Sequence, residues 1–266
     1  MKQLMDSKKY HEMEGTSSTI LKKIAQKSVL HAIKEERSES AALDLGSALH
    51  CAVLEPEKYN VDFLIMPKID GRTKEGKALK ADYEEKAKGK TLLNEEQDAQ
   101  VKAMVQAIHA HEIANGMLTG GEAEYSYFAK DPITGLLLKT RPDYKNAGAL
   151  IDLKTCQDAS REGFIKACIN FGYALQAAFY LDVYNLATGE SLTEFFFVAV
   201  ESSSPYAVAC YKMGETEINV GREQYKKALK QLAEFKKDET KILDFGYEKK
   251  IQEIQFPLWA LEKLSA

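Results

Sequence analysis

Apolar residues in the first part of the chain recur at the spacing of amphipathic helices. Between Ala41 and Leu54 they occupy positions 42, 45, 49, 52 and 53, which is the repeat of one helical face. Glu55-Pro56 is expected to end this helix, because the residue before a proline avoids the helical region. The same pattern predicts a helix from Asn94, its N-cap, to Ala110, and another that begins near Thr19 behind the capping residues Thr16-Ser17-Ser18.

The pattern changes at Gly120-Gly121, where runs typical of strands begin. Residues 124–128 (EYSYF) alternate and are rich in aromatic side chains, and the extended pattern resumes over 136–141 (LLLKTR). Between them, Asp131 to Gly135 carries proline and glycine where a turn needs them. The two runs are therefore predicted to form a hairpin.

The rest of the chain continues as a mixture of strands and helices. Strands are predicted over 149–154, 192–200 and 206–211, and helices over 159–184 and 215–238. This order indicates an α/β (α+β) fold, in which helices flank a mixed sheet. We expect a single domain over residues 1–266, with a mainly helical N-terminal part over 1–115 and the sheet core over 116–266.

A lysine-rich segment interrupts the helical part. Residues 67–91 contain six lysines between Lys68 and Lys88, together with glutamate and glycine. The composition is typical of a solvated, mobile segment with at most one short helix. A path for DNA along these lysines and a plain solvated loop explain them equally well.

The composition narrows the functional classes. The 266 residues carry 36 Lys+Arg against 40 Asp+Glu, a net charge of -4, which leaves room for a local basic groove that binds nucleic acid. The four cysteines include no Cys-x-x-Cys pair, so a thiolate zinc site or an iron–sulfur cluster is not expected. The chain has no apolar run of about 18 residues and no signal-peptide core near its start. We expect a cytoplasmic protein without a membrane segment.

The segment 141–155 (RPDYKNAGALIDLKT) carries the candidate chemistry. Asp143 ends one predicted strand, and Asp152 and Lys154 lie at the end of the next. Side chains alternate along a strand, so residues 152 and 154 share a face, and if the strands are neighbours Asp143 lies close to both. Carboxylate oxygens suit Mg²⁺ or Mn²⁺, and the lysine can help activate water or offset charge on a phosphate. This chemistry hydrolyses a phosphodiester.

The alternative for this segment is an ordinary surface strand. Asp-x-Lys is a common tripeptide, and the pair at Asp152 and Lys154 can be an incidental ion pair. The preceding Pro142-Asp143 and the two-strand context favour the site.

Several ordered segments of the chain resemble one family of nucleases. The pattern is similar to the PD-(D/E)xK nuclease superfamily, within it the RecB-like branch, and most closely the RecE-type exodeoxyribonuclease VIII nuclease domains of prophages. The segments that carry the resemblance are Leu45 to Glu57 (LGSALHCAVLEPE), Glu124 to Asp143 (EYSYFAKDPITGLLLKTRPD), Ile151 to Lys154 (IDLK), Tyr173 to Tyr180 (YALQAAFY), and Val200-Glu201 followed by Pro205-Tyr206. The resemblance implies a restriction-endonuclease-like core.

The resemblance also implies roles for the residues of the metal site. His50 is expected to be a metal ligand, although a histidine beside Leu49 and Val53 is more often part of a core. Asp143 and Asp152 are expected to bind the metal through carboxylates and Leu153 through its backbone carbonyl, with Lys154 as the catalytic lysine.

Further residues have expected roles around this centre. Glu124 is expected to position the site or a second ion, and Gln176 and Tyr180, four apart on one helical face, to fix Lys154 or contact the scissile phosphate. Tyr173 and Arg141 are candidate DNA contacts. For the tyrosine, packing of the helix on the sheet is slightly favoured over a DNA contact. For the arginine, an exposed strand position is nearly as well supported as the contact.

The function that the resemblance implies is a Mg²⁺-dependent exonuclease, with Mn²⁺ as a possible substitute. It would digest linear double-stranded DNA from 5′ to 3′, processively, and leave 3′ single strands for a RecT-like annealing protein. A homo-oligomeric ring is expected, with a tetramer favoured over a trimer. Two alternatives stay open: a structure-specific or RecB-like repair endonuclease of the same fold, and a catalytically inactive DNA-binding module. The intact Asp143, Asp152 and Lys154 argue against the inactive module.

Overall fold

The computed structural model describes residues 1–266 except 36–39, 71, 240–249 and 266. A five-stranded mixed sheet forms its centre, in the order β10-β9-β8-β7-β4. Only β8 and β9 pair in parallel, and the other neighbours are antiparallel. The strands of this sheet are β4 (Glu122–Ala123), β7 (Tyr144–Asn146), β8 (Ala149–Cys156), β9 (Glu194–Glu201) and β10 (Val208–Lys212).

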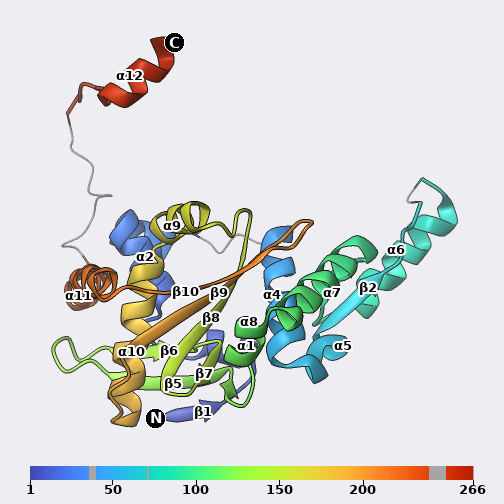
Figure 1. Cartoon of the computed structure of the whole chain (residues 1–266), viewed down its shortest axis with the longest axis horizontal. Coiled ribbons are helices and arrows are strands. Elements are labelled where there is room, and N and C mark those ends of the chain that lie inside the picture. Colours follow the sequence, from blue (N-terminus) through green and yellow to red (C-terminus); the bar gives the residue numbers. More distant parts are fainter. Residues whose placement is uncertain (36–39, 71, 240–249, 266) are drawn as a thin grey trace.

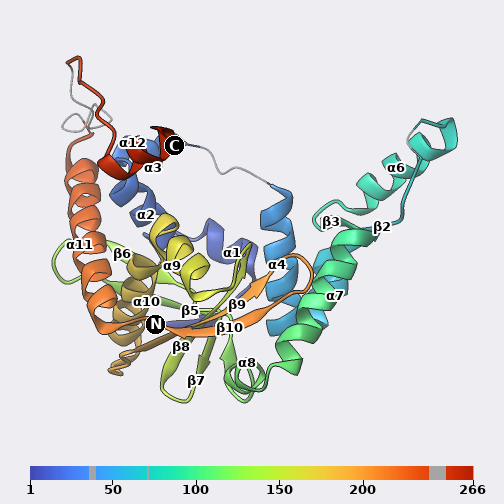
Figure 2. The ribbon, with the colours of Figure 1, turned by 45° about the horizontal axis from the view of Figure 1, so that its top comes forward.

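Two smaller sheets accompany the central one. The first has the order β1-β5-β6, and the second is a parallel pair of β2 and β3 joined through helix α6. Figure 2 shows this pair and α6 projecting to the right, beyond α7. These strands are β1 (Lys2–Leu4), β2 (Phe63–Met66), β3 (Thr91–Asn94), β5 (Tyr125–Lys130) and β6 (Leu137–Thr140).

The helices cover both faces of the central sheet. Figures 1 and 2 show α10 and α11 on one side of the strands and α4 and α7 on the other. The helices are α1 (Ser7–Glu12), α2 (Ser18–Gln26), α3 (Val29–Lys34), α4 (Ala41–Leu54), the 3-10 turn η1 (Pro56–Lys58), α5 (Tyr59–Asp62), α6 (Lys74–Lys86), α7 (Glu95–Ala110), α8 (Glu112–Met117), α9 (Arg161–Asn170), α10 (Tyr173–Thr188), α11 (Glu215–Lys237) and α12 (Leu258–Ser265). None of the helices in the described part is long and apolar enough to cross a membrane.

Side-chain alternation along the central strands builds two cores. Phe195 and Phe197 of β9 are buried in the core beneath α10, whereas Val198 and Val200 are buried in the core beneath α4 and α7. The residues of β8 alternate in the same way, since Leu150 belongs to the first core and Leu153 to the second. Asp152 and Lys154 have the parity of Leu150, so they face α10.

Several predicted elements are confirmed. Helix α4 has the predicted bounds, and α7 begins after Asn94, whose side chain and that of Gln97 form a reciprocal capping box. The strands β5 and β6 pair as the predicted hairpin. The mixed sheet flanked by helices confirms the predicted fold class.

Other predictions about local structure were wrong. The helix expected over 159–184 is two helices, because Gly172 adopts a left-handed conformation with φ 63° and ends the first of them. Asp143 does not end the hairpin strand: β6 stops at Thr140 in another sheet, and the antiparallel neighbour of β8 is β7. The lysine-rich segment is less irregular than expected, because the 13-residue helix α6 fills much of it.

Candidate active site

Three potential metal ligands meet at one end of the central sheet. Ligand atoms of His50, Glu124 and Asp143 all lie within 4.8 Å of one another. No other group of three such ligands is found among the described residues. Helix α4 supplies His50, the bend between β4 and β5 supplies Glu124, and the residue before β7 is Asp143. His50 Nδ1 lies 3.5 Å from Asp143 Oδ2.

The backbone holds the two carboxylates of this group in place. Glu124 has a positive φ of 57°, which is unfavourable for a residue with a side chain. Its N–H donates to the carbonyl of Asp143 over 3.0 Å, and the backbone N–H of Leu153 donates to Asp143 Oδ2 over 2.7 Å. The strained bend and the two hydrogen bonds thus bring Glu124 and Asp143 to the edge of β8.

A second group lies beside the first, on the face of β8 that packs against α10. Asp152 is 1% exposed, and its Oδ1 accepts a hydrogen bond of 2.6 Å from Gln176 Nε2. Its Oδ2 forms an ion pair with Lys154 Nζ. Lys154 also lies over the ring of Tyr173, 5.2 Å from the centroid. Asp152 is therefore held between an amide and an ammonium and is not one of the three clustered ligands.

The carboxylates of Glu124, Asp143 and Asp152 lie close enough to repel one another in a largely buried site. Burial, followed by repulsion from Asp143, raises the pKa of Glu124 to about 7 and that of Asp152 to about 6. Burial disfavours the charged form of Lys154, but attraction to Asp152 and Asp143 outweighs it and raises the pKa of Lys154. A bound cation would relieve the repulsion between these carboxylates.

The donor set fits a hard divalent cation. The carboxylate oxygens of Glu124 and Asp143 suit Mg²⁺ or Mn²⁺, and the imidazole of His50 adds a third donor atom. A cleft of about 830 Å³ gives access to the site. Its walls come from α2, α4 and the junction of α9 and α10, and side chains of both groups line it.

Arg141 has a different setting from the one expected. Its side chain is only 6% exposed, its Nε pairs with Glu124, and its guanidinium lies 3.7 Å from Oε2 of Glu55. Arg141 therefore neutralises carboxylates of the protein and is not the exposed strand residue expected as the alternative. It also lines the cleft, and its contact with a DNA phosphate remains a prediction.

The two tyrosines of α10 mainly pack. Tyr173 is 9% exposed and stacks on Phe197 with ring centroids 5.6 Å apart, while its other neighbours include Lys154. Tyr180 packs edge-on against Phe195, and burial raises its pKa, opposed by a hydrogen bond to Ser18. Contacts of either tyrosine with DNA remain predictions. So does the ligand role of the Leu153 carbonyl.

One residue of the site was missed by sequence analysis. Lys22 of α2 lines the cleft, and its Nζ donates to Gln176 Oε1 over 3.0 Å. In the sequence it is one of two adjacent lysines on an amphipathic helix, which is the usual pattern of a solvated face. Only the packing of α2 against α10 brings it to the site.

Comparisons with known proteins agree with this architecture. The family described as "PDDEXK-like domain of unknown function (DUF3799)" matches residues 17–243. A solved structure of a candidate exonuclease from Eubacterium rectale superposes with a TM-score of 0.66 at 16% sequence identity, over 97% of this chain and 98% of that one. A likeness at this identity shows a shared fold.

More distant matches are weaker. The alkaline exonuclease LHK-Exo from Laribacter hongkongensis matches with a TM-score of 0.29 and 17% identity, over 74% of this chain and 100% of that one. A score of this size does not establish a shared fold. No curated protein matches the sequence.

Proposed function

The chain belongs to the PDDEXK-like family DUF3799, and on that premise we propose that it is a Mg²⁺-dependent exonuclease that hydrolyses linear double-stranded DNA. One observation carries the proposal. His50, Glu124 and Asp143 form a compact donor group directly beside the buried pair of Asp152 and Lys154. The similar structure from Eubacterium rectale, described as a candidate exonuclease, supports the same class of activity.

The proposed roles follow from the contacts. The cation would be held by His50, Glu124 and Asp143. Asp152 would become a further ligand once the cation offsets the negative charge of the carboxylates. A cation bound there would lower the pKa of an attacking water and offset charge on the phosphate. Mn²⁺ offers the same preference for oxygen ligands and is the expected substitute.

Lys154 acts from the protein side of this reaction. Its ammonium is fixed by Asp152 and by the face of Tyr173, so it presents a preorganised positive charge at the floor of the cleft. Such a charge stabilises the negative charge that develops on the phosphate in the transition state. Because Asp152 is itself held by Gln176, the position of Lys154 depends on a chain of contacts rather than on one bond.

The finer assignment follows the RecE-type resemblance. We propose digestion from 5′ to 3′ that proceeds processively and leaves a 3′ strand for a RecT-like annealing protein in the cytoplasm. A homo-oligomeric ring, tetrameric or trimeric, would account for processivity, because DNA threaded through a closed ring cannot leave sideways.

The test uses duplex DNA with and without ends. A linear duplex labelled at either the 5′ or the 3′ terminus is incubated with the protein and Mg²⁺, beside a covalently closed circle of the same sequence. We expect mononucleotides from the linear duplex and none from the circle. Cleavage of the circle would replace the exonuclease by an endonuclease of the same fold, and binding without cleavage of either substrate would favour the inactive DNA-binding module.

A further inference from the structure

The side-chain amide of Gln176 connects Lys22 to Asp152. Gln176 is 4% exposed, and its amide group has two different partners: Nε2 donates to Asp152 Oδ1, and Oε1 accepts from Lys22 Nζ. An amide rotated by half a turn would direct its oxygen at the Asp152 carboxylate and its NH₂ group at an ammonium. Both contacts would then be repulsive.

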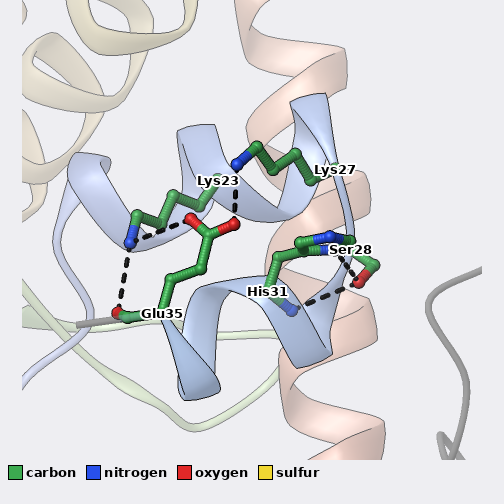
Figure 3. A network of polar contacts seen from close by, with 5 residues as sticks. All are labelled: Lys23, Lys27, Ser28, His31 and Glu35. Atoms are coloured by element: carbon green, nitrogen blue, oxygen red, sulfur yellow. Dashed lines mark hydrogen bonds and ion pairs between the residues drawn. The ribbon is translucent and has the colours of Figure 1, made fainter.

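Lys22 differs from its neighbours on α2 in the partner of its ammonium. Among the residues that the structure describes, no acidic oxygen forms an ion pair with its Nζ, whereas Lys23, Lys27 and Glu35 form ion pairs nearby (Figure 3). Burial, followed by repulsion from Lys154, lowers the pKa of Lys22 to about 8. The ammonium instead donates to Gln176 Oε1 and lies 5.8 Å from the ring centroid of Tyr173.

The backbone at the α9–α10 junction leaves room for the side chain of Lys22. The α9–α10 junction passes next to Lys22 at Gly172, where a Cβ atom would lie 3.2 Å from Lys22 Cδ. Gly172 also needs its left-handed conformation to end α9 and begin α10. The side chain that follows one turn later, Gln176, is thereby brought within hydrogen-bond distance of Lys22.

We propose that Lys22 is a positioning residue of the active site: it fixes the orientation of the Gln176 amide, which in turn holds the Asp152 carboxylate for its partner Lys154. The contacts run from α2 to α10 to β8, three elements that are far apart in the sequence. The role deepens the proposed nuclease function and rests on it. The proposed role differs from that of a residue that contacts DNA directly, because Lys22 acts through Gln176.

The test is a double-mutant cycle with Lys22→Met and Gln176→Ala. Methionine keeps most of the stem of the lysine and removes its charge. In single-turnover digestion of a linear duplex, Lys22→Met should slow cleavage by about tenfold, the lower end of the range for groups that orient the residues of a metal site. In the Gln176→Ala background, Lys22→Met should add less than about a twofold further loss, because the intermediary is already gone.

Lys27→Met is the matched control. Lys27 ends the same helix, is exposed and pairs with Glu35 (Figure 3), so its loss should leave the rate of cleavage unchanged. DNA affinity measured in Ca²⁺ should be the same for wild type and Lys22→Met. If the two substitutions instead multiply in their effect and affinity falls, Lys22 contacts a phosphate of the DNA directly and the positioning role is overturned. An unchanged rate for Lys22→Met overturns it as well.

Melting temperatures of the four proteins of the cycle (wild type, the two single variants and the double variant) test the contact between Lys22 and Gln176 without relying on activity. Because Lys22 and Gln176 share a hydrogen bond, the shift caused by Lys22→Met should be smaller in the Gln176→Ala background than in the wild type. Additive shifts would overturn the proposed contact even if the protein were no nuclease. Absence of cleavage by the wild type, with non-additive shifts, would refute the nuclease function and leave the contact in place.

Discussion

Asp143 accepts a hydrogen bond from the backbone N–H of Leu153 over 2.7 Å, at a separation of ten residues along the chain. This bond attaches the residue before β7 to the strand that carries Asp152 and Lys154. It places the carboxylates of Asp143 and Asp152 near each other in a buried site, and their repulsion contributes to the raised pKa of Asp152. We expect the repulsion between the two carboxylates to be smallest when a cation lies between them.

Replacement of Glu124 tests the donor group. Because Glu124 lies with His50 and Asp143 within 4.8 Å, Glu124→Gln should weaken Ca²⁺ or Mn²⁺ binding by about tenfold or more. Isothermal titration calorimetry measures this directly. The matched control is Glu122→Gln, two residues away, whose carboxylate pairs with Lys2 at the surface. Equal affinities for Glu124→Gln and the control would remove Glu124 from the metal site.

Stability of the metal-free protein should depend on pH through the same acids. The pKa values of Glu124 and Asp152 are raised to about 7 and about 6, so the folded state binds protons that the unfolded chain has lost above about pH 4. Stability contributed by these groups therefore falls as pH rises from about 4 to about 7. Urea unfolding in EDTA at pH 5 and pH 8 should show a smaller loss in Glu124→Gln than in the wild type. An identical loss in both proteins would contradict the raised pKa of Glu124.

Removal of the Arg141 guanidinium should destabilise the fold rather than weaken DNA binding. Arg141→Met leaves Glu124 without its cation, whereas Glu55 keeps its ion pair with Lys58, and the loss costs about 3 kcal/mol or more in free energy of unfolding. The cost should be smaller at pH 5, where Glu124 is protonated, and the double variant with Glu124→Gln should recover part of it. A fall in DNA affinity at unchanged stability would instead support the phosphate contact.

Asp152→Ala should abolish cleavage and preserve DNA binding. The substitution removes the charge partner of Lys154 and the acceptor of Gln176 at once, so the ammonium is no longer held in place. Electrophoretic mobility shifts in Ca²⁺, beside digestion in Mg²⁺, separate the two properties. Near-normal turnover of Asp152→Ala would show that the site is misassigned.

Local sequence patterns were sufficient for those features that depend on neighbours in the chain. The apolar spacing before Pro56 gave the bounds of α4, and strand alternation placed Asp152 and Lys154 on one face. The break at Gly172 had a local signal as well, because a glycine inside a helical pattern often marks a helix end.

Features that depend on packing were not accessible in this way. The contact between Lys22 and Gln176 spans 154 residues, and nothing in the sequence near Lys22 distinguishes it from the other lysines of this helix. The burial of Arg141 depends on Glu55 and Glu124, which reach it from other elements. The membership of β6 in a separate sheet is likewise decided by long-range strand pairing, so Asp143 approaches β8 from β7 and not from the hairpin.

The most direct test of the proposed mechanism is the rate of cleavage by Lys154→Ala, compared with its DNA affinity. Single-turnover digestion of an end-labelled linear duplex in Mg²⁺ is measured beside a binding titration in Ca²⁺. If Lys154 stabilises charge in the transition state, the rate falls on the order of a hundredfold or more while affinity changes little, and Lys154→Arg does not restore it. Equal losses of rate and affinity, or cleavage by Lys154→Ala at the wild-type rate, would contradict the proposal that this buried pair is the catalytic centre of a nuclease.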